Sequence, residues 1–507
     1  MEQYLFLATV LILSLAFVKL WPRNNGENLP PGPWQLPVIG SLHHLAGKLP
    51  HRAMRDLARR HGELMLLRLG ELPVVVASSP AAAREVMRTH DAAVATRPQT
   101  ATLRALTRDG LGVAFAPQGE HWRCLRKLCV TELLGARRVR CLRRARESEA
   151  AALVASLSSS SSTTTSEPVN VSSLVARYVT DAVVRAVVGD RISDRDAFLE
   201  RLEEGVKVAA GFTLADVFPS SRLARVLSGA ARRAEAHSRE MTRLMDGVIE
   251  EHRQRRAATG WRDEDLLDVL LRIQKDGGLQ IPLDMGTIRA VIIDLFSAGS
   301  ETTGTTLQWA MAELMRNPAA LRKAQAEVRG VLAGHTHVTE DALPDLHYLH
   351  LVIKETLRLH VAVPLLLPRE CQEPRRRVLG YDVPERAMVL VNAWAICRDA
   401  AVWGPDAEEF RPERFDGGGA VDFRGTDFEF VPFGAGRRMC PGVAFAVAIM
   451  ELGLASLLFH FDWELAGGAA AAGELDMAEG LGITARRKSD LWLHATVRVP
   501  VPNTETS

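Results

Sequence analysis

Residues 430–442 read Phe-Val-Pro-Phe-Gly-Ala-Gly-Arg-Arg-Met-Cys-Pro-Gly, and this stretch decides the fold. A lone Cys440 lies in a glycine-rich run, and a helical pattern follows from about residue 443 to residue 459. The glycines of the stretch allow positive φ and close backbone approach, which suits tight folding against a flat ligand. The start of a helix carries partial positive charge and unpaired N–H groups, so it favours cysteine as a thiolate. The alternative interpretation is a buried structural cysteine in a loop.

The spacing of this stretch resembles the haem-binding signature of the cytochrome P-450 superfamily, with the fixed positions Phe433, Gly436, Arg438, Cys440 and Gly442 all filled. The resemblance implies heme b (iron protoporphyrin IX) as the cofactor, with Cys440 as the axial thiolate ligand of the iron, as is established for that superfamily. It also implies that the signature residues around the cysteine contact this cofactor, namely Phe433, Gly434, Arg438 and Gly442.

The composition is that of a large globular protein. The chain has 507 residues, of which 47% are hydrophobic and 24% charged, so it can bury a sizeable core. The formal net charge of +1 gives no general argument for nucleic-acid binding, and we expect none. The six cysteines form no CxxC pair, which argues against a zinc site and a disulfide framework and indicates a reducing compartment.

The N-terminus predicts a membrane anchor. Residues 4–18 are apolar apart from Thr9 and Ser14, and Lys19 and Arg23 follow the apolar run. Because the positive charges come after the run, we expect an uncleaved transmembrane helix over residues 1–21, with the rest of the chain in the cytosol. A cleaved signal peptide is the alternative interpretation.

Three regions are therefore expected along the chain. After the anchor, residues 22–40 are interpreted as a proline-rich hinge, because Leu29-Pro-Pro-Gly-Pro33 favours a stiff, extended connector. Residues 41–507 are expected to form the haem-thiolate catalytic domain. Such hinges are typical of microsomal members of the superfamily, so the resemblance implies the endoplasmic reticulum membrane with a single-pass anchor.

The coarse pattern of the body is mainly α with small β-sheets, which is the cytochrome P-450 fold that the resemblance implies. The serine- and threonine-rich run 156–166 is expected to be a flexible loop. Periodicity predicts helices over 50–60, 80–90, 282–316 and 348–360, mostly helical structure over 122–330, and strands within 64–77 and 378–391.

Trp122 and Arg126 have i, i+4 spacing, so both side chains project from one face of the predicted helix. An indole N–H beside a guanidinium can donate to a carboxylate. The pair resembles the donors to the haem propionates, and Arg369 is implied as a third such donor. Packing of the tryptophan beside a surface arginine is the alternative.

Oxygen chemistry is expected on the helix 282–316, which contains Ala298-Gly-Ser-Glu-Thr-Thr303. The small residues Ala298 and Gly299 would let a planar cofactor approach the backbone. Glu301 beside Thr302 pairs a carboxylate with a hydroxyl, which is the minimum needed to deliver protons through water. The stretch resembles the oxygen-activation motif of the superfamily, and Glu301 and Thr302 are its candidate catalytic residues.

A second charged group is expected to have a structural role. Glu355 and Arg358 lie at i, i+3 on the helix 348–360, close enough for an ion pair. By resemblance, Arg414 joins them in a buried ion cluster that fixes one geometry. After this helix, Val361-Ala362 replaces two prolines that are common in plant members, which puts the backbone path beside the substrate in doubt.

Four segments are expected to line the substrate pocket by resemblance, and all are largely apolar, although plain core packing is the alternative for any one residue. They are 208–218, 292–298, 361–367 and 481–484. The chain has no GxGxxG between a strand and a helix, so electrons are expected from a separate partner, by resemblance NADPH-cytochrome P-450 reductase. Its acidic surface would meet Arg123, Arg126, Lys127 and Arg437.

The motifs resemble most closely plant microsomal cytochromes P-450, in particular the large plant family 71 group of specialised metabolism. The resemblance implies a monooxygenase that uses O2 and NADPH-derived electrons to hydroxylate a hydrophobic metabolite, with terpenoids (diterpenoids among them) first and indolic or phenolic compounds second. An isomerase or dehydratase of the same superfamily that needs no external electrons is an alternative. A haem sensor or binding protein without catalysis is a further one.

Overall fold

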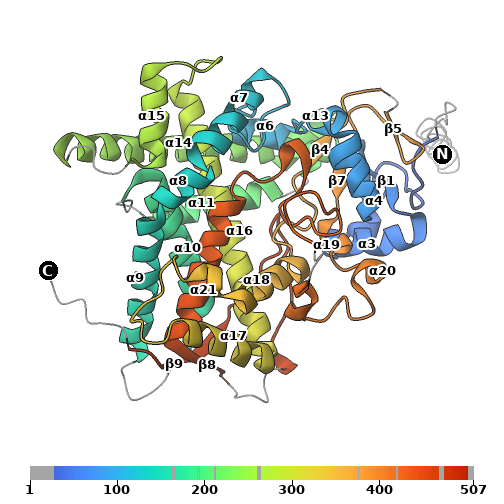
Figure 1. Cartoon of the computed structure of the whole chain (residues 1–507). Coiled ribbons are helices and arrows are strands. Elements are labelled where there is room, and N and C mark those ends of the chain that lie inside the picture. Colours follow the sequence, from blue (N-terminus) through green and yellow to red (C-terminus); the bar gives the residue numbers. More distant parts are fainter. Residues whose placement is uncertain are drawn as a thin grey trace, which may run out of the picture.

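The computed structural model describes residues 28–161, 167–190, 192, 195–210, 213–259, 264–374, 376–417, 421–466 and 473–500. The predicted anchor (1–21) and the first residues of the predicted hinge lie outside these ranges. The described chain is mainly helical with three small sheets, which confirms the predicted fold class for the body of the protein (Figure 1).

The helices follow the chain with short connections between most of them. The first half contains α2 (Leu42–Leu45), α3 (Pro50–His61), α4 (Pro80–Arg84), α5 (Asp91–Val94), α6 (Ala101–Thr107), α7 (Glu120–Leu128), α8 (Ala136–Cys141), α9 (Arg143–Ser161), α10 (Val171–Val188), α11 (Arg195–Ala210), α12 (Leu214–Val217), α13 (Arg222–Ser228) and α14 (Ala230–Thr259). The second half contains α15 (Leu266–Asp276), α16 (Met285–Arg316), α17 (Pro318–Val331), α18 (His347–Leu359), α19 (Ala393–Ile396), α20 (Ala400–Trp403) and α21 (Val443–His460).

Short turns of other helix types extend some of these. They are the π-helical segments η1 (Glu85–Thr89) and η2 (Cys129–Leu133), and the 3₁₀ segments η3 (Leu343–Asp345), η4 (Pro412–Phe415) and η5 (Gly436–Arg438). The π segments continue α4 and α7 directly, so each widens the end of the helix before it. The predicted helix 80–90 is therefore α4 followed by η1.

The largest sheet has the strand order β1-β2-β7-β4, formed by Leu64–Leu69, Leu72–Ala77, Met388–Val391 and Arg369–Glu370. Its first two strands, which lie within the predicted range 64–77, are an antiparallel hairpin in which Leu69 pairs with Leu72 around a turn at Gly70 and Glu71. Gly70 has φ +63°, which a side chain would strain. The sheet lies beside α3 and α4 in Figure 1.

Two smaller sheets complete the β portion. One has the order β3-β9-β8, from Val169–Asn170, Trp492–Val497 and Phe461–Leu465, and the other pairs β5 (Arg376–Val378) with β6 (Tyr381–Val383). Strand β8 follows α21 without a loop and pairs with β9, so the C-terminal part of the chain returns to the helical body. Strands β8 and β9 lie at the bottom of Figure 1, near α17.

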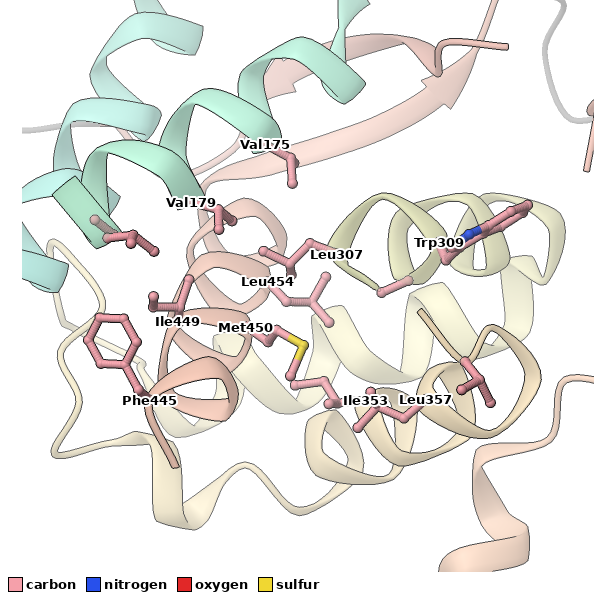
Figure 2. Close-up of a cluster of buried hydrophobic side chains, with 14 of the residues drawn as sticks. Val175, Val179, Leu307, Trp309, Ile353, Leu357, Phe445, Ile449, Met450 and Leu454 are labelled. Carbon is pink, nitrogen blue, oxygen red and sulfur yellow. The ribbon is translucent and has the colours of Figure 1, made fainter. Parts of the chain in front are cut away.

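The core lies between α10, α16, α18 and α21, which come from the middle and the end of the chain (Figure 2). Apolar side chains from all four helices meet there, including Val179, Leu307, Ile353 and Ile449. Because α21 carries apolar residues around its whole circumference, it can be buried on every side. This rigid centre holds α16 and the N-terminus of α21 in a fixed relation.

Helix α21 also has the length and hydropathy of a membrane span. Its 18-residue window has a mean hydropathy of 1.9 and is 67% buried inside the structure. It is the one helix among the described residues that passes this test. The packing against α10, α16 and α18 identifies it as a core helix.

The second half of the predicted hinge packs on the body. The carbonyl oxygen of Pro31 accepts a hydrogen bond of 2.9 Å from the Leu66 N–H on β1. A Cβ at Gly32 would overlap the Leu66 carbonyl, so only glycine fits this approach. Residues 31–40 are thus fastened to the edge of the large sheet.

One local prediction was wrong. The serine run was expected to be a loop from residue 156, but α9 continues through Ser161. The hydroxyls of Ser156 and Ser158 donate to the carbonyls of Leu153 and Val154, which lets serine stay inside the helix. Residues 162–166 of the run lie outside the described ranges.

The start of α21 agrees with the helical pattern predicted from about residue 443. Gly442 is the N-cap, so Pro441 precedes the helix. Gly442 has φ −93°, whereas Gly434 and Gly436 have φ +69° and +68°. Positive φ is therefore used at two of the three glycines of the signature.

Candidate functional site

A cavity of about 420 Å³ lies inside the helical body and reaches Cys440. This volume is in the range of small-molecule sites, which is about 300–1,000 Å³. All four segments that were expected to line a pocket contribute to it, through residues such as Ala209, Ile293, Val363 and Ile483. Leu481 does not, because its side chain is 77% exposed on the surface.

Cys440 lies at the wall of this cavity, in the stretch 430–442 that leads into α21 and that we call the signature loop. Its backbone N–H donates to the Phe433 carbonyl at 2.9 Å, which closes the loop on itself. Its side chain is accessible from the cavity. The surrounding protein shields it from bulk solvent, and this burial raises the pKa of the thiol, while the Gly442 N–H and the nearby Arg126 charge act in the opposite direction.

Six arginines line the same cavity, and four of them repel one another electrostatically: Arg97, Arg126, Arg369 and Arg438. Burial and repulsion from the other three hold the pKa of Arg97 well below its usual value. For the same two reasons, the pKa of Arg438 falls to about 9. Burial also lowers the pKa of Arg126 and of Arg369. The four guanidinium groups therefore form a site of excess positive charge.

This excess of charge has little internal compensation. Arg369 donates to Asp91 Oδ1 at 2.6 Å and to the Ala435 carbonyl at 2.9 Å. Asp294 is the only carboxylate among the described residues that line the cavity. A flat ligand with two carboxylates would supply the missing negative charge, because guanidinium groups bind carboxylates with strong charge-assisted bonds. The residues present therefore fit the two propionates of a haem.

Trp122 and Arg126 both line the cavity from α7, as their i, i+4 spacing predicts. The Trp122 ring is buried, and the guanidinium of Arg438 lies over it, with 4.0 Å between the guanidinium carbon and the ring centroid. Arg438 also donates to the carbonyls of Ala95 at 2.7 Å and Ala116 at 2.5 Å. These contacts fix one arginine of the cluster in a single orientation.

The signature loop contributes further residues to the cavity. Phe433, Gly434 and Gly442 line the cavity together with Cys440. Arg437, next to Arg438, is exposed on the outer surface. Its backbone N–H donates to Asp91 Oδ2 at 2.8 Å, so Asp91 links the loop to Arg369.

Helix α16 presents Ala298, Gly299 and Thr302 to the cavity. The Thr302 hydroxyl donates to the Ala298 carbonyl at 2.7 Å, which is the i−4 bond expected for threonine inside a helix. The next turn repeats the pattern, because the Thr306 hydroxyl donates to the Thr302 carbonyl at 3.0 Å. A hydroxyl therefore lies on the same cavity as the cysteine.

Glu301 does not line the cavity with Thr302. Its Oε1 atom accepts from the Thr484 hydroxyl at 2.6 Å and lies 3.2 Å from Nε of Arg486. Thr484 itself is a lining residue. The carboxylate thus lies behind the wall, and the threonine hydroxyl on the C-terminal segment is the group between it and the cavity.

The predicted ion cluster forms outside the cavity. Glu355 and Arg358 are fully buried, and Arg358 donates to both carboxylate oxygens at 2.7 and 2.8 Å. Arg414 donates to Glu355 Oε1 at 3.0 Å. The remaining N–H groups of Arg358 reach the carbonyls of Cys397 and Ala407, each at 2.7 Å. The cluster thus joins α18 to the segment before the signature loop.

The segment that departs from the plant pattern is held by the C-terminal segment. The carbonyl of Ala362 accepts from the Ala485 N–H at 2.9 Å, and the Ala485 carbonyl accepts from the Trp309 indole at 2.7 Å. Trp309 stacks on His360, with ring centroids 4.0 Å apart. These bonds fix the backbone path that Val361-Ala362 had left in doubt.

One group of side chains outside the cavity could hold a metal ion by type: His252, Asp265 and Asp268. Arg256 already contacts both carboxylates, so its guanidinium occupies the place where a cation would bind. The group also provides the capping box of α15 through Asp265 and Asp268. We therefore interpret it as a structural cluster.

Sequence reasoning missed two charged residues of the site, Arg97 and Asp294. Arg97 lies in an irregular segment, and its partners are the carbonyls of Ala114, Leu367 and Pro368. These partners come from distant parts of the chain, so no local spacing marks it. Asp294 had a local signal, because it is one acidic residue in the apolar stretch 291–298 of a buried helix.

Comparisons with known proteins agree with this geometry. The profile of the cytochrome P450 family matches residues 30–482. The chain is 46% identical to desmethyl-deoxy-podophyllotoxin synthase of Sinopodophyllum hexandrum over 97% of this chain and 96% of the relative. It is 45% identical to dolabradiene monooxygenase of Zea mays over 98% of this chain and 99% of the relative. Premnaspirodiene oxygenase of Hyoscyamus muticus is 43% identical over 99% of both chains.

Proposed function

Because the chain belongs to the cytochrome P450 family and its relatives include a named monooxygenase and a named oxygenase, we propose that it is a monooxygenase that hydroxylates a hydrophobic plant metabolite. Terpenoids are the first candidates for this substrate. The observation that carries the proposal is one cavity lined by Cys440, by the cluster of four arginines and by Thr302. A thiol, a cationic cradle and a proton donor on one cavity are the parts that such a reaction needs.

The proposed roles of the residues follow from their contacts. Cys440 would hold the haem iron, and the cluster of Arg97, Arg126, Arg369 and Arg438, with the Trp122 indole, would hold the propionates. When bound, the haem supplies activation of O2, with the electron density of the thiolate favouring O–O cleavage. The closed loop around the Phe433 carbonyl keeps the sulfur in place before the cofactor arrives.

We propose that Thr302 moves a proton at its hydroxyl oxygen, and that Glu301 supplies protons from behind the wall. The contact of 2.6 Å between Glu301 and Thr484 supports a path in which the Thr484 hydroxyl is an intermediate donor. Glu301 is partly solvent-exposed and can exchange protons with bulk water. In this path the Thr484 side chain lies between Glu301 and the cavity, so Glu301 is further from the cavity than its sequence position next to Thr302 suggests.

The cavity supports an apolar substrate. Its outer wall is made mainly of apolar residues, among them Leu106, Val206, Ile293 and Ile483. Few polar groups are available for orientation, which suits a hydrocarbon-rich molecule. Two relatives are named for dienes, dolabradiene and premnaspirodiene, and this favours a terpenoid, a diterpenoid included, over an indolic or phenolic compound.

We further propose that the protein works at the endoplasmic reticulum membrane with NADPH-cytochrome P450 reductase. Large apolar side chains are exposed on two segments that meet at the β1–β2 turn: Trp34 and Val38 on one, and Leu223, Val226 and Leu227 on the other. Gly70 N–H donates to the Ile39 carbonyl and Glu71 N–H to the Val217 carbonyl at that turn. A lipid surface would cover this apolar face. Arg123, Lys127 and Arg437 are exposed and support docking of an acidic electron donor.

Two experiments test the proposal. Cys440→Ala should abolish the reduced-CO absorption band of a thiolate haem, whereas Cys371→Ala, a substitution of a buried cysteine that is not on the cavity, should keep it. Survival of the band in Cys440→Ala would refute the ligand assignment.

The second experiment concerns the substrate. Purified enzyme with reductase and NADPH should give hydroxylated product from members of a terpenoid panel that produce a type I spectral shift. Product formation without NADPH and reductase would instead support an isomerase or dehydratase. Spectral shifts confined to an indolic or phenolic panel would reject the terpenoid assignment.

A further inference from the structure

We infer that Asp294 is a positioning residue that, through the loop Gly112–Ala116, holds Arg97 and Arg438 in place for the cofactor carboxylates. This inference rests on the proposed function, because it assigns those two arginines to the propionates. Asp294 lies on α16 and lines the cavity. Its carboxylate has no role in the hydroxylation itself in this proposal.

The loop Gly112–Ala116 carries the acceptors of both arginines. Arg97 Nε donates to the Ala114 carbonyl at 3.0 Å, and Arg438 Nη2 donates to the Ala116 carbonyl at 2.5 Å. Arg438 Nη1 also reaches the Val113 carbonyl at 3.4 Å. These three carbonyls therefore help to fix the two guanidinium groups, together with the carbonyls of Leu367 and Pro368 for Arg97 and of Ala95 for Arg438.

The same loop is held from its other side by Asp294. The Ala114 N–H donates to Asp294 Oδ2 at 2.9 Å, and the Val113 N–H is a second donor to this carboxylate. The loop is neither helix nor strand, so its backbone groups need partners from elsewhere. Within the described loop those partners are side chains: Asp294 for the amides, and arginines and Gln99 for the carbonyls.

Gly112 gives an independent observation. A Cβ at this position would overlap Oδ2 of Asp294 and approach the Ala290 carbonyl. The backbone of the loop thus lies directly against α16, and only glycine permits this distance. Charge supports the same arrangement: Asp294 is the single carboxylate among the described cavity-lining residues, opposite an excess of arginine.

Ala114 shows the link most directly, because its own backbone groups contact both Asp294 and Arg97. Its N–H donates to Asp294, and its carbonyl accepts from Arg97. Loss of the carboxylate would leave two amides unpaired, and the loop would move away from α16. Both arginines would then lose the acceptors that the loop supplies and keep only those outside it, although neither touches Asp294 in a hydrogen bond.

The test measures the cofactor and the loop separately in the holoenzyme. Asp294→Asn should raise the rate of haem transfer to excess apomyoglobin about tenfold. The reason is that the loss of a hydrogen bond to a charged group changes an equilibrium constant by a factor of about ten or more. Asp294→Leu, which has no acceptor, should raise it further. Hydrogen–deuterium exchange should increase in peptides that cover residues 110–118, with the rest of the protein unchanged.

Gly112→Ala provides a second variant, because it disturbs the same contact from the side of the loop. It should reproduce the faster haem transfer and the local increase in exchange. The matched controls are Asp284→Asn, an acidic residue at the start of the same helix, and Gly247→Ala, a helical glycine with open space around it. Both controls should behave as the unchanged protein.

The outcomes separate this inference from the proposed function. Unchanged haem transfer in Asp294→Asn and Gly112→Ala would overturn the inference, and so would faster loop exchange without faster haem transfer. If Asp294→Asn fails to fold, the comparison of haem transfer in Gly112→Ala and Gly247→Ala tests the inference by itself. Loss of the thiolate band only in Cys440→Ala keeps the proposed function intact in each of these cases.

Discussion

The guanidinium of Arg438 lies over the buried indole of Trp122, with 4.0 Å between the guanidinium carbon and the ring centroid. The two residues are far apart in the sequence, one on α7 and one in the loop before α21. The contact places a cation, whose pKa is lowered to about 9, on an aromatic face at the wall of the cavity. The contact joins the part of the site on α7 to the loop before α21.

Replacement of Arg438 by lysine should weaken cofactor retention. Lysine cannot reproduce the planar contact with Trp122 or the several directed bonds of the guanidinium, so we expect haem transfer to apomyoglobin to become about tenfold faster. Trp122→Leu should cause a smaller change of about twofold to tenfold, because it removes the cation–π contact and one indole N–H but keeps the guanidinium of Arg438. Arg437→Lys is the control, since that side chain is exposed. Equal rates for Arg438→Lys and Arg437→Lys would contradict the prediction.

Thr302→Ala should retain haem but divert reducing equivalents to hydrogen peroxide. The substitution removes the hydroxyl that donates to the Ala298 carbonyl and that we assign to proton delivery. We expect the ratio of product to NADPH consumed to fall by about 10²-fold or less, in line with the usual contribution of general acid catalysis. Thr302→Ser keeps the hydroxyl and should restore coupling. Unchanged coupling in the alanine variant would remove Thr302 from the mechanism.

Glu355→Gln should destabilise the protein strongly. The carboxylate is fully buried and compensates both Arg358 and Arg414, so its loss leaves the buried Arg358 charge without a carboxylate partner and Arg414 with Asp406 alone. We expect the free energy of unfolding to fall by about 3–5 kcal/mol, measured by urea denaturation. Glu413→Gln, which breaks an exposed pair with Lys323, should cost about 1 kcal/mol or less. Comparable losses for the two variants would argue against a buried cluster.

Stability should depend on pH through His252. Burial alone would lower the pKa of this imidazole, but hydrogen bonds to Asp265 and Asp268 more than offset burial and raise the pKa from 6.5 to about 9. The folded-state pKa lies above the unfolded one, so the stabilisation is fully present below pH 6.5 and is lost as the pH rises through about 9. The contribution is about 3 kcal/mol at most.

Urea denaturation below pH 6.5 and above pH 9 measures this effect. His252→Gln should flatten the loss of stability in that window, because glutamine carries no titrating proton. A variant that keeps the full pH dependence would show that another group causes it. Chelators should have no effect on stability, since Arg256 already contacts both carboxylates.

The sequence was sufficient where the physical cause of a feature is local. The hairpin of β1 and β2 follows from apolar runs around a glycine turn, and Leu69 pairs with Leu72 across that turn. The spacing of Trp122 and Arg126 places both on one helix face, and both line the cavity. Glu355 and Arg358 likewise meet because one helical turn separates them.

The sequence was insufficient where the partner comes from far along the chain. Glu301 turns to Thr484 and Arg486 on the C-terminal segment, which no spacing around residue 301 could indicate. Arg97 is held by carbonyl groups, and a carbonyl acceptor leaves no signal in the sequence because every residue has one. The serine run failed for a different reason, since side-chain bonds to the preceding turn kept a helix where composition favoured a loop.

The loop Gly112–Ala116 is fastened through its peptide groups, and its side chains at Val113 and Phe115 face the cavity. Those two positions can thus be exchanged by evolution without disturbing the cradle, because the bonds that hold the loop do not depend on which residue stands there. Substitutions at these two positions would therefore reshape the cavity wall while the hydrogen bonds of the loop to Asp294, Arg97 and Arg438 stay in place.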